Sequence, residues 1–219
     1  MANYKKLKRN YRKKSKISFP LTGPVRLYRK VRFGMSASSA IASINGDWNA
    51  IVYRANSIFD PDFSGLGSQP RSIDQYFTLY QHSVVLYAKI VVRLAYRSST
   101  ETDSVRCLLN LSGSSAPLAD DADLMESRYR KFGMLTQGGK TQMTMSMKVD
   151  PNKFLSISSP IGSALVRGDD TTSSNLNPTE QCFFHISIKG VVDSSVTVDV
   201  QGYIDYDVCF TEPRLPVQS

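Results

Sequence analysis

The first 46 residues contain no aspartate or glutamate, and the first carboxylate of the chain is Asp47. The same segment holds twelve of the 27 lysines and arginines, so residues 47–219 carry 15 basic residues against 19 acidic ones. The N-terminal segment, residues 1–46, therefore carries only positive charge and is joined to a mildly acidic body, residues 47–219. Such asymmetry excludes an evenly charged domain and indicates that the N-terminal segment has an anionic partner.

Cysteine is scarce, and so are long apolar runs. Cys107, Cys182 and Cys209 are odd in number and show no CxxC spacing, which favours buried reduced thiols over a disulfide framework or a zinc site. No window approaches the ~18 consecutive apolar residues of a transmembrane helix. The basic start is not followed by the apolar segment of a signal peptide. We therefore expect the protein to be synthesised in the cytosol and not to insert into a membrane.

Groups for acid–base or metal chemistry are also few. Histidine occurs only at His82 and His185, and the favoured interpretation of both is a structural or surface role. The run GMLTQGGKT has Met134 where a phosphate loop needs glycine, and a strand pattern follows where such a loop opens a helix. The aspartates lack EF-hand spacing, although calcium binding by acidic loops stays open. The sequence thus predicts no enzyme activity, no catalytic residue, no cofactor and no metal.

The body has instead a strong period of two. In VTVDVQGYIDYDVCF, residues 196–210, the even positions are apolar except for Gly202, and the odd positions are mostly polar. A strand sends alternate side chains to opposite faces, so this pattern predicts one long half-buried strand. Further strands are predicted at 83–96, 143–149, 182–188, 25–33, 48–55, 105–111 and about 128–135. About eight such strands favour an all-β antiparallel sandwich or barrel.

One or two short helices are expected in the loops. Between 70 and 80, apolar residues recur at i, i+3, i+4 and i+7, and Ser72 and Gln75 have the spacing of a capping box that would start the helix. A weaker helix is expected within 117–129, where acidic residues come early. Residues 150–179 are polar and predicted to be a long loop, which in a compact domain is usually functional or disordered.

Residues 1–20 are interpreted as a nucleic-acid-binding arm and residues 21–219 as the folded domain. Lysine and arginine displace counterions from a phosphate backbone without reading its sequence, and an aromatic ring among them could stack on an unpaired base. The same charges could serve as a nuclear localisation signal. The predicted nucleic-acid contacts, in the arm and on the first strand, are Lys5, Lys6, Lys8, Arg9, Tyr11, Arg12, Lys13, Lys14, Lys16, Arg26, Arg29, Lys30 and Arg32.

Two motifs carry a resemblance to a known family. The stretch ANSIFDPDFSGLGSQPRSIDQYFTLY resembles the segment after strand C in the capsid (coat) proteins of small circular Rep-encoding single-stranded DNA viruses. The ending IDYDVCFTEPR resembles the closing strand of the same family. The order of strands and loops agrees over about 25–213, while the arm is shorter and richer in lysine than the arms common in the family.

The resemblance implies a viral structural protein with a single eight-stranded antiparallel jelly roll and a basic N-terminal arm. About sixty identical subunits would close into a small icosahedral T=1 shell. The arms would face inward and package single-stranded nucleic acid, with DNA favoured. The protein would be found in the virion and, during assembly, in the host nucleus. Neither the host nor its receptor is indicated.

Apolar side chains in the predicted loops are expected to be covered by neighbouring subunits. Loops are normally exposed, so large apolar residues there need a partner surface. The predicted subunit-interface residues are Ile58, Phe59, Phe63, Leu66, Phe154 and Leu155.

Three alternatives stay open. Coat proteins of small RNA satellite viruses share the jelly roll and a basic arm. A monomeric cellular nucleic-acid-binding β-barrel would use strand aromatics for base stacking. A carbohydrate-binding or enzymatic jelly roll would need clustered tryptophans or paired carboxylates in a cleft, and the single Trp48 speaks against it.

Overall fold

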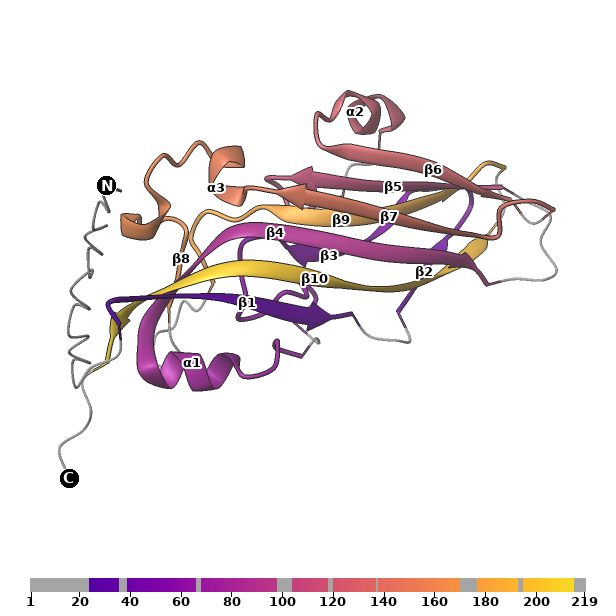
Figure 1. Ribbon diagram of the computed structural model, residues 1–219. Coiled ribbons are helices and arrows are strands. Elements are labelled where there is room, and N and C mark those ends of the chain that lie inside the picture. Colours follow the sequence, from indigo (N-terminus) through magenta and orange to yellow (C-terminus); the bar gives the residue numbers. More distant parts are fainter. Residues whose placement is uncertain are drawn as a thin grey trace, which may run out of the picture.

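The structure is a computed structural model that describes residues 24–35, 39–65, 68–97, 104–117, 120–136, 138–169, 177–192 and 195–214 (Figure 1). Most of these residues lie in extended strands. The strands are β1 (Arg26–Gly34), β2 (Ala40–Ser43), β3 (Asn49–Arg54), β4 (Tyr80–Tyr96), β5 (Ser104–Ser112), β6 (Arg130–Thr136), β7 (Gln142–Val149), β8 (Arg167–Asp169), β9 (Phe183–Gly190) and β10 (Val196–Pro213).

The strands form two antiparallel sheets that face each other. One sheet has the order β1-β10-β4-β7, and the short strands β2 and β8 extend it by pairing with β10 and β4. The other has the order β3-β9-β5-β6. Figure 1 shows the first sheet in front of the second, with β5 and β9 behind it.

The strand pairing is nested along the chain. With β2 and β8 left out, the first strand pairs with the eighth (β1–β10), the second with the seventh (β3–β9), the third with the sixth (β4–β7) and the fourth with the fifth (β5–β6). This is a long hairpin rolled into two sheets, which is the jelly-roll arrangement. The predicted single eight-stranded antiparallel jelly roll is confirmed.

The core between the sheets is supplied by alternate residues of the strands. In β10, Val200, Ile204 and Val208 are buried, while Asp205 and Asp207 between them are partly exposed. The predicted register of the closing strand is therefore confirmed. Complete burial of such a side chain contributes on the order of 1.5–3 kcal/mol, so a core of this kind is the main source of stability.

The helical segments are short and lie in the connections. They are α1 (Ile73–Leu79), α2 (Asp121–Glu126), α3 (Pro151–Phe154) and the 3-10 turn η1 (Pro160–Gly162). The two expected helices correspond to α1 and α2. The predicted capping box is wrong, because Ser72 has a left-handed φ of 68° and makes no side-chain cap hydrogen bond. By contrast, the Asp120 carboxylate caps α2 by accepting from the Ala122 N–H at 2.8 Å.

The segment 150–179 is more ordered than a long loop. It contains α3, η1 and β8, and residues 170–176 lie outside the described part. Asp150 caps α3 by accepting from the backbone N–H groups of Asn152 and Lys153, both at 3.1 Å. Asn152 then donates to the Val85 carbonyl at 2.9 Å, which fastens α3 to β4. The amino-acid composition of this segment alone does not predict its hydrogen bond to β4.

The predicted arm, residues 1–20, lies outside the described residues. The described chain enters β1 at the end of the sandwich that also carries α1 and α3 (Figure 1). Within the described residues, no helix is long and apolar enough to cross a membrane.

Candidate nucleic-acid and subunit interfaces

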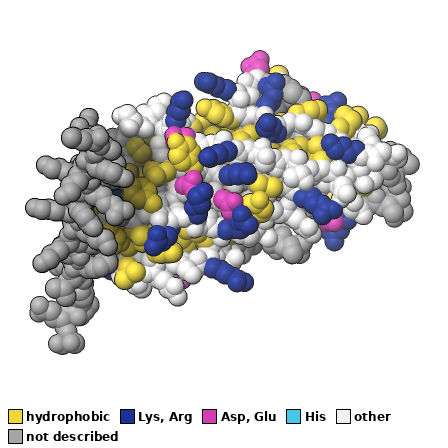
Figure 2. Space-filling view, viewed as in Figure 1, with side chains coloured by type: hydrophobic (Ala, Val, Ile, Leu, Met, Phe, Trp, Pro, Cys, Tyr) yellow, Lys and Arg dark blue, Asp and Glu magenta, His cyan; other side chains and the backbone are white. Residues whose placement is uncertain are grey.

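The outward side of the β1-β10-β4-β7 sheet carries charged residues from all four strands, and we refer to it as the charged face. Figure 2 shows lysines and arginines spread over this face with a few carboxylates among them. The register places Arg32 of β1, Asp205 of β10, Lys89 of β4 and Lys148 of β7 in one row across the four strands. Three cations and one anion thus share this row.

The cations of β1 are matched by aspartates of β10. Arg32 donates two hydrogen bonds to the Asp205 carboxylate, at 2.6 and 2.9 Å, and this pairing raises the pKa of its guanidinium. Lys30 lies 3.7 Å from Asp207. The predicted contacts Lys30 and Arg32 therefore do lie together on one exposed surface, but their charge is partly compensated. Such exposed pairs contribute little stability, so a stronger anion could exchange with the aspartates.

The other predicted nucleic-acid contacts are placed less specifically. Arg26 and Arg29 are exposed, and Arg29 donates to the Tyr28 carbonyl at 3.1 Å. The remaining predicted residues, Lys5, Lys6, Lys8, Arg9, Tyr11, Arg12, Lys13, Lys14 and Lys16, lie outside the described residues.

Two further lysines on the charged face were missed from the sequence. Lys89 and Lys148 are direct cross-strand partners in the β4–β7 pair, and both are exposed. Alternation along each strand predicts that each points outward. Their juxtaposition depends on the pairing register, which the alternation does not give. Together with Lys30, Arg32 and Tyr87, they line a shallow groove of about 520 Å³.

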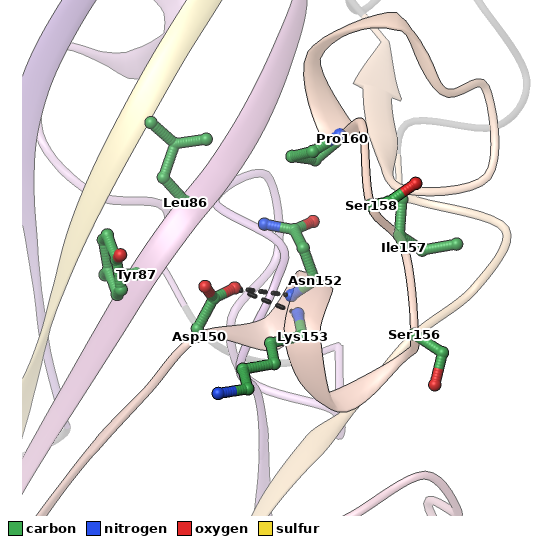
Figure 3. A pocket seen from close by; sticks show the side chains of 9 residues that line it. All are labelled: Leu86, Tyr87, Asp150, Asn152, Lys153, Ser156, Ile157, Ser158 and Pro160. Atoms are coloured by element: carbon green, nitrogen blue, oxygen red, sulfur yellow. Dashed lines mark hydrogen bonds between the residues drawn. The ribbon is translucent and has the colours of Figure 1, made fainter.

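A second hollow lies on the other side of Tyr87 (Figure 3). It has a volume of about 490 Å³ and is formed by β4 together with the α3–η1 segment. Its walls include Leu86, Asn152, Ile157 and Pro160. The Tyr87 ring, which is 44 % exposed, lines both the groove and this pocket.

The predicted subunit-interface residues fall into four groups. Ile58 is 2 % exposed and belongs to the core of its own chain, so its predicted interface role is wrong. Phe59 is half-buried, and Phe154 and Leu155 pack against the same core. Phe63 is 41 % exposed, and its ring meets that of Phe183 edge-on at 5.4 Å. Leu66 lies outside the described residues.

The burial of Ile58 has a physical cause in the hydrogen bonds of its segment. The neighbouring Asn56 donates to the Glu180 carbonyl at 2.8 Å and accepts from the Cys182 N–H at 3.1 Å. Ser57 donates to the Asn177 side chain at 2.6 Å. These bonds fold the segment onto the chain just before β9, so its apolar side chains are covered without a second subunit.

Three of the exposed apolar side chains lie at the end of the sandwich opposite the entry to β1. Ile44, Val191 and Val192 are 58, 41 and 63 % exposed. They lie in the β2–β3 and β9–β10 turns, which are joined because the Gly190 N–H donates to the Ser43 hydroxyl at 3.1 Å. We call these three residues the apolar tip. The sequence analysis missed them because they lie in short turns next to the ends of strands.

The histidines and cysteines have structural surroundings. All three cysteines are free and buried, as predicted, and burial raises the pKa of Cys107 and Cys182 to about 12. His82 lies between Asp169 and Glu212, at 2.7 and 3.2 Å, and thereby links β4 to β8 and β10. Among the described residues, no group of three or more His, Cys, Asp or Glu is placed to hold a metal ion.

His185 is completely buried on the outward side of β9. Its Nε2 lies 2.9 Å from the Ser114 carbonyl, so Nε2 carries the proton and donates. Burial lowers the pKa of the imidazole below its ordinary value, because the charged form would lose its hydration. The interpretation of His185 as a structural residue is confirmed.

Acidification is therefore expected to destabilise the domain through His185. The unfolded imidazole has a pKa of about 6.5, so below that pH the unfolded chain binds a proton that the folded chain resists, and stability falls as the pH falls. His185→Gln keeps an N–H donor near Ser114 and does not titrate. We expect its melting temperature to fall less between pH 7.5 and 5 than that of the wild type. If the melting temperatures of the variant and the wild type fell equally between pH 7.5 and 5, this role of His185 would be refuted.

Trp48 is also a structural residue. Its indole N–H donates to the Asp121 carboxylate, which lies 3.3 Å from Arg106 and 3.4 Å from Lys189. The hydrogen bond from Trp48, together with the two cations, lowers the pKa of Asp121. This cluster fastens α2 to the β3-β9-β5-β6 sheet. The only tryptophan of the chain is thus engaged within the fold rather than offered as a sugar-stacking surface.

No protein-family model matches the chain, and no curated protein sequence matches it. Solved structures do. A chain in the structure of turnip yellow mosaic virus is 13 % identical in sequence, with a TM-score of 0.42; the match covers 90 % of the present chain and 99 % of the viral one. Mud crab tombus-like virus is 8 % identical over 87 % and 92 %, with a TM-score of 0.45. A T=1 subviral particle of a Penaeus vannamei nodavirus capsid protein is 9 % identical over 84 % and 99 %, with a TM-score of 0.40. These values describe a distant likeness only.

Proposed function

We propose that the chain is a viral capsid subunit that assembles into a small closed shell and packages single-stranded nucleic acid. The observation that carries the proposal is the join between two parts of the chain. A segment with twelve cations and no carboxylate, residues 1–46, leads into and includes the first two strands of a complete jelly roll. Jelly rolls occur in viral capsids and in lectins, and the cationic segment favours the capsid.

The charge of the arm is suited to a polyphosphate. In a shell of about sixty copies, the twelve cations of residues 1–46, eight of them in the arm, would supply about 700 positive charges, enough to offset much of a genome of one to a few thousand phosphates through counterion release. Lys89 and Lys148 of the charged face would add to this if that face is turned inward. The chain enters β1 beside this face, which is consistent with arm and face sharing one partner.

The resemblance to capsid proteins of circular Rep-encoding viruses supports a DNA genome. It also supports a T=1 shell, residence in the virion and passage through the host nucleus. A satellite-type RNA virus coat is the second candidate. Nuclease treatment of nucleic acid extracted from purified particles distinguishes them, because deoxyribonuclease would degrade the expected genome and ribonuclease would not.

The experiment that tests the proposal neutralises the arm in the full chain. The eight cations at Lys5, Lys6, Lys8, Arg9, Arg12, Lys13, Lys14 and Lys16 are replaced by glutamine. Particles are expected to form with a sharply lower ratio of absorbance at 260 to 280 nm, because the folded body is untouched while its polyanion-binding charge is lost. A variant with the arm residues in scrambled order is the matched control and should package normally, since counterion release does not read sequence.

Two results would contradict the proposal. Neutralised particles that retain the wild-type absorbance ratio would show that the arm does not package nucleic acid. A wild-type protein that elutes only as a monomer and shows no particles by electron microscopy would favour the cellular β-barrel alternative.

A further inference from the structure

The lysines Lys89 and Lys148 form a like-charge pair on the charged face. Directly opposed residues in an antiparallel pair have Cβ atoms about 4.5–5.5 Å apart, and like charges at such positions are destabilising. Within the described part of the chain, neither ammonium forms an ion pair with a carboxylate. The aspartates of β10 that could compensate them are engaged elsewhere, since Asp205 pairs with Arg32 and Asp207 with Lys30. An anion that bridges the two lysines would relieve this repulsion.

An aromatic ring stands next to the lysine pair. Tyr87 precedes Lys89 by two residues on the same face of β4, and the Lys148 ammonium lies 5.1 Å from the centre of the Tyr87 ring. Tyr87 lines both the groove, which also contains Asp205 and Asp207, and the pocket shown in Figure 3. Tyr87 is therefore next to two positive charges in the groove and to the apolar walls Leu86 and Pro160 in the pocket.

The pocket also holds an unmet hydrogen-bond acceptor. Asn152 is 4 % exposed, and its amide nitrogen donates to the Val85 carbonyl. Its amide oxygen has no hydrogen-bond partner among the described residues. An unpaired buried acceptor of this kind costs free energy. This oxygen is itself buried, so Asn152 shapes the wall of the pocket and offers no exposed acceptor to a ligand.

We propose that these groups form a subsite for one unpaired nucleotide on the folded body of the subunit. Its phosphate lies between Lys89 and Lys148, and its base enters the pocket beside Tyr87. The subsite rests on the proposed function and extends it, because it names a nucleic-acid contact of the body in addition to the arm. A single strand is required, since bases paired in a duplex have no free face for Tyr87.

The phosphate contacts are tested by the salt dependence of binding. Full-length Lys89→Gln/Lys148→Gln protein is titrated with a single-stranded oligonucleotide at several salt concentrations. Its plot of log affinity against log salt should be shallower than that of the wild type by about 1.4, because each lost contact to a single strand removes about 0.7. Lys131→Gln/Lys140→Gln is the matched control, since both lysines are exposed and lie outside the groove. Equal slopes for the subsite variant and the wild type, or an equal loss in the control, would overturn the proposal.

The base contact is tested at Tyr87. Tyr87→Ala should weaken binding of a single strand about 5- to 150-fold, the range for loss of one base–aromatic stack. Tyr87→Phe keeps the ring and should bind as the wild type does. Binding of a duplex of the same length should be unchanged in both variants, a difference that general damage to the fold would not produce. A Tyr87→Ala protein with unaltered single-strand affinity, or with equal losses for single strand and duplex, would overturn the base contact.

The remaining outcomes separate the subsite from the proposed function. Single-stranded DNA and RNA of one sequence are compared, and a similar loss for both in Tyr87→Ala is expected, because the stacked base and the phosphate are common to them. If arm neutralisation empties the particles while the Lys89/Lys148 variant binds normally, the subsite is rejected and packaging by the arm stands. If the wild type binds no single strand, the packaging function itself fails.

Discussion

Replacing Val208 by aspartate is expected to abolish soluble, folded protein. Val208 is 1 % exposed and lies in the core on β10, the strand that pairs with both β1 and β4. A carboxylate there has no partner, and burying even an uncharged polar group without a hydrogen bond costs several kcal/mol. Domains are stable by only about 5–15 kcal/mol, so one such group removes much of the total. Soluble yield and the near-ultraviolet circular dichroism of any recovered protein measure the effect.

The adjacent residue provides the control. Asp207→Asn changes charge by one unit at a partly exposed position and loses only the surface pair with Lys30. Surface pairs of this kind contribute about 0–1 kcal/mol, so the variant should be recovered in normal yield and melt within a few degrees of the wild type. Equal tolerance of the two substitutions would mean that the inward and outward faces of β10 have been exchanged.

This pair of variants also shows why the strands were predictable. Buried and partly exposed positions alternate in β10 from Ile204 to Val208, so the sequence alone identifies Val208 as core and Asp207 as surface. The same rule locates the other long strands to within one to three residues at their ends. It fails for β2 and β8, which have four and three residues. Such short segments contain too few alternations to distinguish a strand from a loop.

Contacts between distant segments were less predictable. Ile58 looks like an exposed loop residue in the sequence, because the bonds of Asn56 to Glu180 and Cys182 that bury it join positions more than 120 residues apart. The Lys89–Lys148 pair has the same origin, since it exists only once β4 and β7 are in register. Local patterns fix which way a side chain points, and tertiary pairing decides what it meets.

The charge of the first strand illustrates a second limit. The basic row of β1 is correctly predicted to be exposed, but its neutralisation by Asp205 and Asp207 is a property of the β1–β10 register. Counting charges along the chain therefore overestimates how much of this row is free for an external anion. It also overlooks β4 and β7, where the cations have no carboxylate partner among the described residues.

Placing aspartates on the apolar tip is expected to yield a folded protein that does not assemble. Ile44 and Val192 are both more than half exposed, in turns that are joined by the Ser43–Gly190 hydrogen bond. Neither side chain belongs to the core, so Ile44→Asp/Val192→Asp should fold normally. In a closed symmetric shell every copy presents the same patch, and large exposed apolar side chains mark contact surfaces. Two new carboxylates per subunit would then repel across each symmetry-related contact and lose the apolar burial.

Size-exclusion chromatography and electron microscopy measure this result, and circular dichroism verifies the fold. We expect the wild type to elute as particles of about sixty subunits and the aspartate variant as monomers or small oligomers with a wild-type spectrum. Ile44→Thr/Val192→Thr is the control, because threonine keeps the branched side chain, adds no charge and should permit assembly. Normal particles from the aspartate variant would exclude the apolar tip as a subunit contact, and would direct attention to Phe63, the exposed aromatic of the loop after β3.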